Sequence, residues 1–370
     1  MHQEPSGVWI MAYTTIDDPS AYFQIDLYTG NGTAGTAYTF DGNSDLQPDF
    51  IWGSQRDEDG GARFVFDSSR GTTKRLKTDA NTEEQTRSGV TAFGSDGFTM
   101  GDHADSNNNS ETHVVWAWKA NGGTTTTNDA SATSVGSVDS VYQANTTSGF
   151  SIVTYTGTGS GDITLAHGLG KVPNLIIGKV RNQSYDWRVY HSSEGASKAI
   201  QLNGNGAAGT NNAWGGTTPT STVFTVGRGS DENMNYGSGD TIVAYCFADI
   251  QGYSKFGSYT GNGNADGTFV YTGFKPAWIM AKRTDTAKNW YIADSKRSPI
   301  NVNKAHLVAN DTDAEDTSGD ATDSYFDILS NGFKLRQDFS HLNADGGTFV
   351  YIAFAEHPFV SSEGVPTTAR

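Results

Sequence analysis

The side chains that could perform chemistry in this chain are few and scattered. Its single cysteine is Cys246, and it has eight histidines. No serine lies in a GxSxG turn, the sharp turn that presents a nucleophile to its base. His103 and His113 are separated by the loop ADSNNNSET and do not have the ligand spacing of a zinc site on one element. These patterns predict no catalytic residue, no metal site and no cofactor, and therefore a protein that is not an enzyme.

Two acidic loops carry enough oxygen atoms for calcium binding to be considered. The segment NDTDAEDTSGD, residues 310–320, begins like a calcium loop at Asp311 and Asp313, but Asp316 stands where an EF-hand loop has its glycine. Residues 101–111, GDHADSNNNSE, are interpreted in the same way. We predict two solvated loops and leave calcium binding open as the alternative. Paired carboxylates for glycoside hydrolysis need only lie about 5 to 10 Å apart in space, and no particular pair is indicated.

The aromatic residues could bind a sugar ring by stacking, so their strand phase matters. Trp187 and Trp290 alternate in phase with aliphatic neighbours, which predicts that both are core residues. Tyr190 and Tyr291 have the opposite phase, which makes them either exposed or buried at a subunit contact. Trp214 lies in the loop NGNGAAGTNNAWGGTTPT, where no strand face accounts for it. It either plugs one end of a sandwich or presents its ring to a ligand, and it is the one candidate ligand-binding residue.

The composition favours short strands joined by polar turns. Of the 370 residues 18 % are charged, 12 % are aromatic and 44 are glycine. The formal net charge of −16 repels phosphate backbones and anionic head groups, which argues against nucleic acid as a partner. No stretch approaches the roughly 20 apolar residues of a membrane span, and we expect neither membrane insertion nor a secretion signal. Cys246 lies in the run IVAYCF and is predicted to be a core residue.

One pattern of landmarks occurs three times along the chain. The marker YTGNG or YTGTG stands at residues 28–32, 155–159 and 259–263. Each marker is followed by a proline before an apolar run, an alternating segment, a turn with a phenylalanine and a closing apolar run. The matched residues are Pro48, Pro173 and Pro276; Phe64, Trp187 and Trp290; Phe98, Phe224 and Phe333; Trp116, Tyr245 and Ile352; and Trp118, Phe247 and Phe354. Such alternation has the period of a β-strand.

The pattern predicts an all-β protein of three tandem, diverged antiparallel β-sandwich domains of jelly-roll-like type. The closing runs are nearly continuous in apolar residues and should be central strands covered on both faces. The expected boundaries are an N-terminal arm at 1–19, repeats at 20–121, 148–252 and 253–359, a Thr/Ser/Gly-rich linker at 122–147 and a C-terminal tail at 360–370. The second and third repeats abut almost without a spacer, so we expect them to pack together.

Several segments resemble one known family over nearly all of residues 11–359. They are MAYTTIDDPSAYFQ leading into LYTGNG, LAHGLGKVPNLIIGK, TPTSTVFTVG, GYSKFGSYTGNG, GFKPAWIMAKR with NWYIADSKR, and the ending YIAFAEHPF. This combination resembles the repeat-containing tail-fibre-like and virion structural proteins of marine bacteriophages of the cyanophage type. The resemblance implies a β-sandwich protein exposed on the virion, without known catalytic residues or cofactor. In such proteins MAYTTIDDP looks like a natural start, so either Met1 or Met11 is the first residue.

The resemblance and the repeats together predict a virion structural protein, assembled in the host cytoplasm. We expect a tail-fibre or surface appendage component that takes part in host attachment. Its expected partners are further copies of itself, with a trimer favoured, other virion proteins and host-surface glycan. The alternative is a capsid decoration or head-fibre protein with a purely architectural role, and a third hypothesis is a glycan depolymerase. Variable loops on a constant sandwich framework suit recognition.

Overall fold

The computed structural model describes residues 12–57, 60–228, 234–317 and 325–367 and is almost entirely β-structure. Within these ranges the helical elements are short: η1 (Pro19–Ala21), α1 (Ala104–Asn107) and α2 (Ala130–Thr133). No helix of the described chain has both the length and the apolar character needed to cross a membrane. The strands pair antiparallel. The predicted all-β, antiparallel fold class is therefore confirmed.

The strands form three pairs of sheets, and each pair is called a unit below. The first unit has the sheet β1 (Phe23–Thr29), β9 (Thr112–Trp118), β3 (Phe50–Gln55), β4 (Arg63–Asp67), β5 (Lys74–Lys77), β6 (Gln85–Thr86), and the smaller sheet β2 (Thr36–Tyr38), β8 (Gly97–Met100), β7 (Val90–Gly94). The third unit has β20 (Ser254–Thr260), β27 (Thr348–Pro358), β22 (Phe274–Arg283), β23 (Trp290–Asp294), β24 (Leu307–Val308), and the smaller sheet β21 (Phe269–Tyr271), β26 (Gly332–Leu335), β25 (Phe326–Leu329).

The second unit has the same arrangement with additional strands at its edge. Its large sheet is β10 (Thr126–Asn128), β11 (Ser140–Asn145), β12 (Phe150–Thr158), β19 (Ser238–Phe247), β14 (Leu175–Val180), β15 (Arg188–His191), β16 (Lys198–Gln201), β17 (Gly209–Thr210). Its smaller sheet is β13 (Ile163–Ala166) and β18 (Val223–Val226). Five strands of this sheet match five strands of the first unit in the same spatial order, with β12, β19, β14, β15 and β16 in the places of β1, β9, β3, β4 and β5. The segment 122–147, which the composition predicts to be either an extended linker or a covering arm, contains β10 and β11, and these strands extend this sheet.

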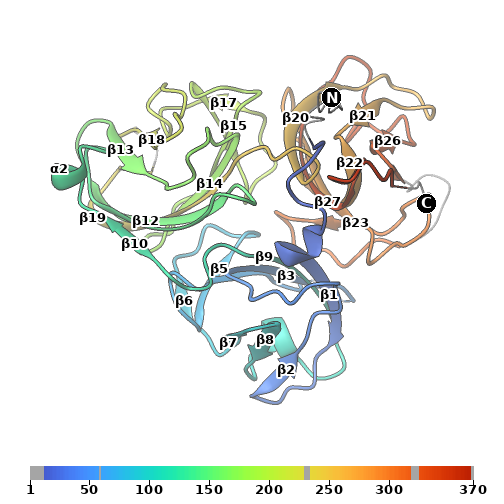
Figure 1. Ribbon diagram of the computed structural model, residues 1–370, viewed down its shortest axis with the longest axis horizontal. Helices are drawn as coiled ribbons and strands as arrows, with labels where there is room; N and C mark the ends of the chain where they lie inside the picture. The colour runs from blue at the N-terminus through green and yellow to red at the C-terminus, as the bar shows by residue number, and fades with distance from the viewer. Residues whose placement is uncertain (1–11, 58–59, 229–233, 318–324, 368–370) are drawn as a thin grey trace, which may run out of the picture.

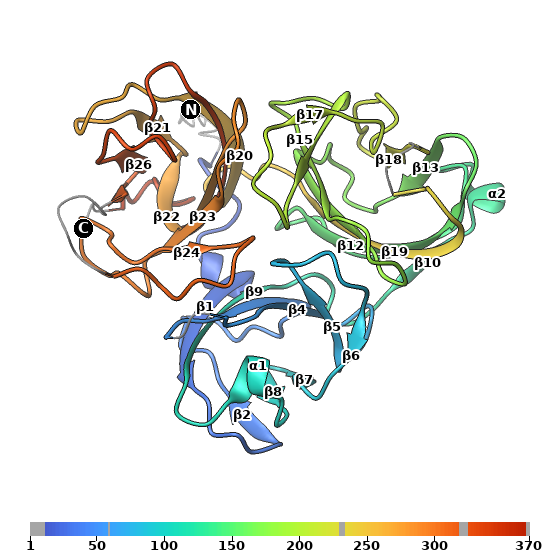
Figure 2. The same ribbon diagram turned by 180° about the vertical axis from the view of Figure 1, so that it is seen from behind.

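The three large sheets face one another around a common centre (Figures 1 and 2). Their inner faces contribute to one continuous hydrophobic core. At its middle the matched residues Trp118, Phe247 and Phe354 meet. Their ring centroids are 6.3 Å apart for Trp118 and Phe247, 5.7 Å for Phe247 and Phe354, and 5.4 Å for Trp118 and Phe354. These spacings are those of attractive aromatic pairs. The chain therefore has an approximate threefold arrangement.

The outer face of each large sheet packs against the smaller sheet of its own unit. Each unit thereby has a separate outer core, in addition to the shared central one. The closing strands β9, β19 and β27 are central in their sheets and covered on both faces, as their continuous apolar sequences predicted. The prolines lie at tolerated places: Pro48 and Pro173 precede strands, and Pro276 lies where the register of β22 shifts.

The strand phase predicted for the first unit was wrong by one residue. Phe64 and Phe66 belong to the outer core, whereas Val65 belongs to the central core with Val189 and Ile292. Arg63, not Phe64, therefore matches Trp187 and Trp290. The three matched side chains donate hydrogen bonds to the backbone of the neighbouring unit: Arg63 Nε to Val308 O (2.9 Å), Trp187 Nε1 to Lys77 O (2.7 Å) and Trp290 Nε1 to Gln201 O (2.9 Å). A shift of one residue exchanges the two faces of a strand.

Each YTG marker is anchored by one buried asparagine. The three amides accept hydrogen bonds from the marker backbone: Asn31 N to Asn107 Oδ1 (3.1 Å), Thr158 N to Asn235 Oδ1 (2.7 Å) and Asn262 N to Asn343 Oδ1 (3.1 Å). The marker tyrosines donate to the carbonyl before each asparagine: Tyr28 to Ser106 O (2.6 Å), Tyr155 to Met234 O (2.9 Å) and Tyr259 to Leu342 O (2.8 Å). This repeated contact explains why the marker recurs, since a buried amide needs partners for its donors and acceptors.

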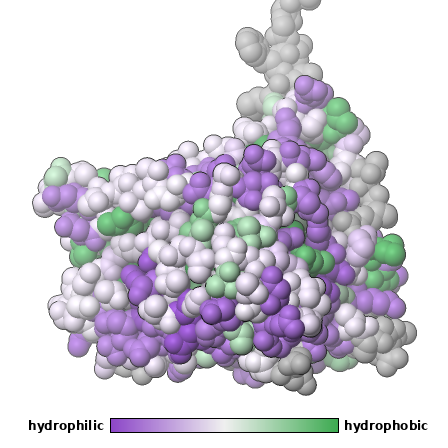
Figure 3. Space-filling model, turned by 90° about the horizontal axis from the view of Figure 1, so that it is seen from below, coloured by the Kyte–Doolittle hydropathy of each residue, from purple (hydrophilic) through white to green (hydrophobic). Residues whose placement is uncertain are grey.

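The outside of the molecule is mainly polar. Figure 3 shows hydrophilic residues and residues of intermediate hydropathy over most of one face, with hydrophobic ones scattered between them. Large apolar side chains that are exposed in the described ranges are Val172, Tyr236, Phe269, Tyr271, Ile300 and Val365. Apolar residues scattered in this way are normal for a protein surface and do not by themselves indicate a binding site.

Candidate functional site: the cleft between the first and third units

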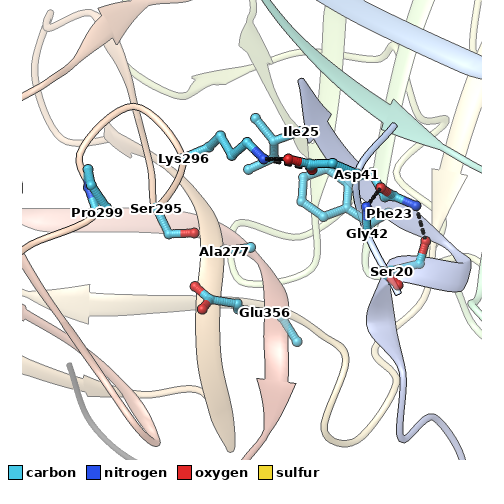
Figure 4. A pocket seen from close by; sticks show the side chains of 12 residues that line it. Ser20, Phe23, Ile25, Asp41, Gly42, Ala277, Ser295, Lys296, Pro299 and Glu356 are labelled. Carbon is cyan, nitrogen blue, oxygen red and sulfur yellow. Dashed lines mark hydrogen bonds and ion pairs between the residues drawn. The ribbon is translucent and has the colours of Figure 1, made fainter. Parts of the chain in front are cut away.

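A cleft of about 340 Å³ lies where the first unit meets the third (Figure 4). One wall comes from β1 and the segments that flank it, and the other from β22, β27 and the turn that follows β23. The lining residues are Ser20, Phe23, Gln24, Ile25, Asp41, Gly42, Ala277, Ser295, Lys296, Pro299, Ala355 and Glu356. Because the two walls belong to different repeats, no single repeat contains the cleft.

The floor of the cleft is apolar and includes two small residues. Phe23 and Ile25 point from β1 into the central core, and Phe23 stacks on Phe354 with the ring centroids 5.3 Å apart. Ala277 and Ala355 line the opposite side and are buried. The short alanine side chains leave room above the floor, while the floor residues themselves remain almost fully buried.

The rim of the cleft carries two ion pairs. Lys296 extends from the third unit to Asp41 of the first, and its Nζ lies 2.7 and 2.5 Å from the two carboxylate oxygens (Figure 4). Lys275 Nζ lies 2.9 Å from Glu356 Oε1. The Asp41 side chain is 69 % exposed, and exposed pairs of this kind contribute little to stability. The cleft lining itself includes Asp41, Lys296 and Glu356, so the rim is polar and charged.

The wall formed by the first unit is held in place by Gln24. Its Nε2 donates to the carbonyls of Ser20 (3.0 Å) and Ser44 (2.7 Å), and its Oε1 accepts from Gly42 N at 2.8 Å. A Cβ atom on Gly42 would lie only 2.4 Å from Gln24 Oε1. Any larger residue at this position would displace the Gln24 side chain, so glycine permits the close approach that these hydrogen bonds need.

Asp26 follows Ile25 on β1 and is the most strongly perturbed carboxyl near the cleft. Burial raises its pKa to about 6, and nearby Asp41 acts in the same direction. Hydrogen bonding to the Leu27 backbone and the charge of Lys296 oppose this shift only in part. Desolvation of an anion is the dominant physical cause. Asp26 is therefore a group that titrates close to neutral pH.

A buried ionic network joins the third unit to the first beneath the cleft. Arg297 Nε lies 2.5 Å from Asp294 Oδ2, and Arg297 NH1 lies 2.9 Å from Glu315 Oε2. Arg56 of the first unit completes the network with bonds of 2.9 and 2.8 Å to Glu315. Burial opposes ionisation of Glu315, but the two guanidinium groups outweigh it and hold its pKa below the ordinary value.

A second, equivalent network joins the first unit to the second. Arg70 Nε lies 2.5 Å from Asp67 Oδ2, and Arg70 NH1 lies 2.8 Å from Glu84. Arg181 of the second unit makes two bonds of 2.9 Å to Glu84. The sequence signal for both networks is the matched tetrapeptide at the end of the alternating segment, DSSR at 67–70 and DSKR at 294–297. This tetrapeptide is not among the landmarks from which the repeats were predicted, which are the YTG markers, the prolines and the apolar segments.

The seam between the second and third units lacks this network. The matched tetrapeptide is HSSE at 191–194. Ala208 stands where the other seams have Glu84 or Glu315, and Thr284 stands where they have Arg181 or Arg56. The matched backbone bonds remain: Ala208 N to Thr284 O (2.9 Å), Glu84 N to Arg181 O (2.6 Å) and Glu315 N to Arg56 O (2.7 Å). Because the side chains here are small, an open space of about 540 Å³ lies at this seam.

The structure places the predicted aromatic residues in the interior. Trp187 and Trp290 are core residues, as expected, and so is Cys246 of the outer core. Tyr190 and Tyr291 are buried within the outer cores of their own units, so neither predicted alternative applies. The alternative in which Trp214 presents its ring to a ligand was wrong, because the side chain is buried. It is 1 % exposed and packs at 6.0 Å against the Tyr190 ring, so it plugs its unit.

The two acidic loops are partly structural, which corrects the prediction that both are solvated. Glu315 belongs to the buried network, and the Asp313 carbonyl accepts a 2.5 Å hydrogen bond from Arg63 NH2. In the other loop, His103 caps α1 and Asn107 is buried. Residues 318–320 lie outside the described residues. In the part of the chain that the structure describes, no group of three or more His, Cys, Asp or Glu could hold a metal ion.

Comparison with known proteins adds a family to this description. No curated protein matches the chain at a significant level, and no solved structure does so. A family model described as a domain of unknown function, DUF7483, matches residues 18–358. This range contains all three units and both walls of the cleft. The protein is therefore a member of the DUF7483 family.

Proposed function

We propose that this protein is a non-enzymatic virion structural protein of a bacteriophage, a component of a tail fibre or surface appendage that takes part in host attachment. The observation that carries the proposal is the use of the buried charged side chains. The two networks around Arg70 and Arg297 join the units to one another. Buried groups with this role supply rigidity, which an exposed attachment protein needs more than it needs a reactive centre.

The surface supports contact with a polar partner such as host-surface glycan. The cleft between the first and third units combines an apolar floor with a rim of lysine and carboxylate side chains. Concave sites of this composition bind ligands by apolar contact and a few oriented hydrogen bonds. The proposal accordingly includes glycan, other virion proteins and further copies of this chain as partners, with a trimer as the favoured oligomer.

A second candidate is a capsid decoration or head-fibre protein with a purely architectural role. The observation that favours it is the approximate threefold arrangement, with Trp118, Phe247 and Phe354 at the middle. A body of this shape suits a threefold position on a particle as well as a fibre axis. The two candidates therefore differ in where the protein lies on the virion and in whether it binds glycan.

Cryo-electron imaging of phage particles, with antibody labelling of this protein, tests the proposal. Density at a distal tail appendage, together with binding of the purified full chain to host-surface polysaccharide, is the expected result. Density distributed over the capsid without glycan binding would overturn the attachment role in favour of the architectural one. Release of oligosaccharide from host envelope material by the purified protein would contradict the non-enzymatic assignment.

A further inference from the structure

The edge strand of the large sheet is covered in the second unit. There β11 pairs with β12 along its whole length, from Asn145 opposite Phe150 to Ser140 opposite Tyr155. The matched strands β1 and β20 are the last strands of their sheets. The chain thus contains one copy of this edge with an added strand and two copies without it.

The backbone groups at the β1 edge are arranged to receive such a strand. Tyr22 O accepts from Lys119 N at 3.0 Å, and Gly30 N donates to Glu111 O at 2.8 Å, so alternate residues between them bond β9. The N–H and C=O groups of the intervening residues, Phe23 and Ile25 among them, point away from β9. In the described residues these groups of Phe23 and Ile25 have no hydrogen-bond partner.

The covered copy shows what an incoming strand would meet. Phe23 and Ile25 pair with Trp118 and Trp116, as Phe150 and Ile152 pair with the matched Phe247 and Tyr245. Phe150 and Ile152 lie opposite Asn145 and Gln143 of β11. The open positions on β1 are therefore those at which β12 binds its additional strand.

The side chain of Gln143 connects the added strand to the neighbouring unit. Its Nε2 donates to Ser68 Oγ (2.9 Å) and Ser69 Oγ (3.0 Å), and its Oε1 accepts from Gly123 N at 2.7 Å. At the cleft beside β1, the residues matched to the two serines are Ser295 and Lys296, and both line the cleft. A carboxamide can bond either of these side chains, because it both donates and accepts.

The β20 edge is less suitable for strand addition. The N–H of Phe256, which matches Ile25, already donates to Asp249 Oδ1 at 2.9 Å. Lys255 also bonds the Asp249 carboxylate. Side chains that occupy edge groups in this way are a known means of protecting a sheet edge. On the β1 edge, Asp26 bonds the Leu27 backbone and the Tyr38 hydroxyl donates to the Thr29 carbonyl at 3.1 Å. The backbone groups of Phe23 and Ile25 have no such cover in the described residues, and this end of β1 adjoins the 340 Å³ cleft.

We propose that the β1 edge is a strand-acceptor site, at which an extended peptide segment of a partner protein adds as an antiparallel strand. The segment is uncharged and polar, like β11 with its sequence SVYQAN, and carries a glutamine or asparagine directed at Ser295 and Lys296. Strand addition derives its affinity from main-chain hydrogen bonds and its selectivity from alternate side chains. This inference does not depend on the proposed virion function.

The test uses the full chain and a blocked peptide of residues 140–147, SVYQANTT, labelled for fluorescence anisotropy. We expect saturable binding, with slower hydrogen exchange of the β1 amides at Phe23 and Ile25. Methylating the peptide nitrogens at the Gln143 and Asn145 positions should weaken binding about tenfold or more, because two main-chain bonds are lost. Methylation at the Tyr142 and Ala144 positions should leave the affinity unchanged, since those groups point away from β1.

Two variants test the side-chain part of the proposal. In Lys296→Ala, the preference for the glutamine peptide over its alanine counterpart should fall by about tenfold to a hundredfold, the effect of one hydrogen bond to a charged group. Lys334→Ala is the matched control, because Lys334 pairs with Asp266 on another face of the third unit. It should leave the preference unchanged.

Three results would overturn the proposal. They are absence of binding at millimolar peptide, binding that is insensitive to the position of the methyl groups, and exchange protection at an edge other than β1. Sedimentation velocity without peptide tests for a second copy as the occupant. A dimer that the peptide dissociates would assign the edge to self-association and overturn the assignment to a partner protein. None of these results bears on where the protein lies in the virion.

Discussion

The Tyr245 hydroxyl of the second unit donates a 2.6 Å hydrogen bond to Oδ2 of Asp67 in the first unit, and both residues are buried. The matched contact between the first and third units uses a different donor: Trp116 Nε1 donates at 3.0 Å to Asp294 Oδ2. Each buried carboxylate also bonds an arginine three residues further along the chain. The central core thus contains polar contacts that specify which units are neighbours.

The third copy of this contact shows coupled replacement on both sides of a seam. Ile352 matches Tyr245 and Trp116 but has no side-chain donor. Facing the third unit, His191 takes the place of the carboxylate, and its Nε2 donates to the Tyr351 carbonyl at 3.2 Å. A buried carboxylate without a hydrogen-bond donor would be destabilising. The replacement of the donor by Ile352 is therefore accompanied by the replacement of the aspartate by His191.

Replacement of Tyr245 by phenylalanine tests the contribution of its hydrogen bond. We expect Tyr245→Phe to lower the free energy of unfolding by about 1 to 3 kcal/mol, because a buried bond to a charged acceptor is lost. Urea denaturation of the purified chain measures this. Tyr253→Phe is the control, since its buried hydroxyl has no partner in the described residues. It should be neutral or slightly stabilising, and an equal loss in both variants would contradict the prediction.

The missing ionic contact between the second and third units can be restored. In Ala208→Glu with Thr284→Arg, the two side chains should form the bidentate pair seen at the other seams, because the backbone bond between these positions is already present. A double-mutant cycle should give a favourable coupling of about 1 kcal/mol or more. The matched control places the acid one residue earlier, as Ala207→Glu with Thr284→Arg. Equal coupling in both pairs would show that the two positions are not matched to the other seams.

Three buried histidines should make the protein sensitive to acid. Burial lowers the pKa of His113, His167 and His191 to about 4. Because each folded-state pKa lies below the unfolded value of about 6.5, their contribution is fully present above pH 6.5 and is lost as the pH falls toward 4. Each should cost about 3 kcal/mol at pH 4. Urea midpoints measured from pH 7.5 to 4 test this, and His191→Gln should flatten the decline. A midpoint independent of pH would contradict it.

Asp26 should have the opposite effect on stability. Its folded-state pKa of about 6 lies above the ordinary 3.8. The folded state is therefore more stable at low pH, where Asp26 is protonated, and loses this stability as the pH rises through 6. Asp26→Asn should therefore raise the free energy of unfolding by about 2 kcal/mol at pH 8 and have little effect at pH 3. Denaturation curves at both pH values measure this. Asp285→Asn should show the reverse dependence, since Arg283 holds the pKa of Asp285 low.

The sequence pattern predicts which residues of β1 share a face of the candidate cleft, but it does not predict which residues lie opposite them. The alternating residues of β1, with Phe23 and Ile25 on one face, could be predicted because strand periodicity places them together. Their position opposite Lys296 could not, because residues in different repeats meet only when the sheets close around the centre. Lys296 and Asp41 are 255 residues apart in sequence. No local rule relates residues at that separation.

The sequence by itself determined the all-β class, the threefold recurrence of the landmarks and the core positions of Trp187 and Trp290, because all of these depend on period and composition over short stretches. The tertiary structure decided the phase of β4, where Arg63 takes a position at which the other units have tryptophan. It also decided that residues 126–145 supply the added strands β10 and β11. A polar, threonine-rich segment becomes a strand here because an open edge offers its backbone hydrogen-bond partners, and that edge exists only in the folded molecule.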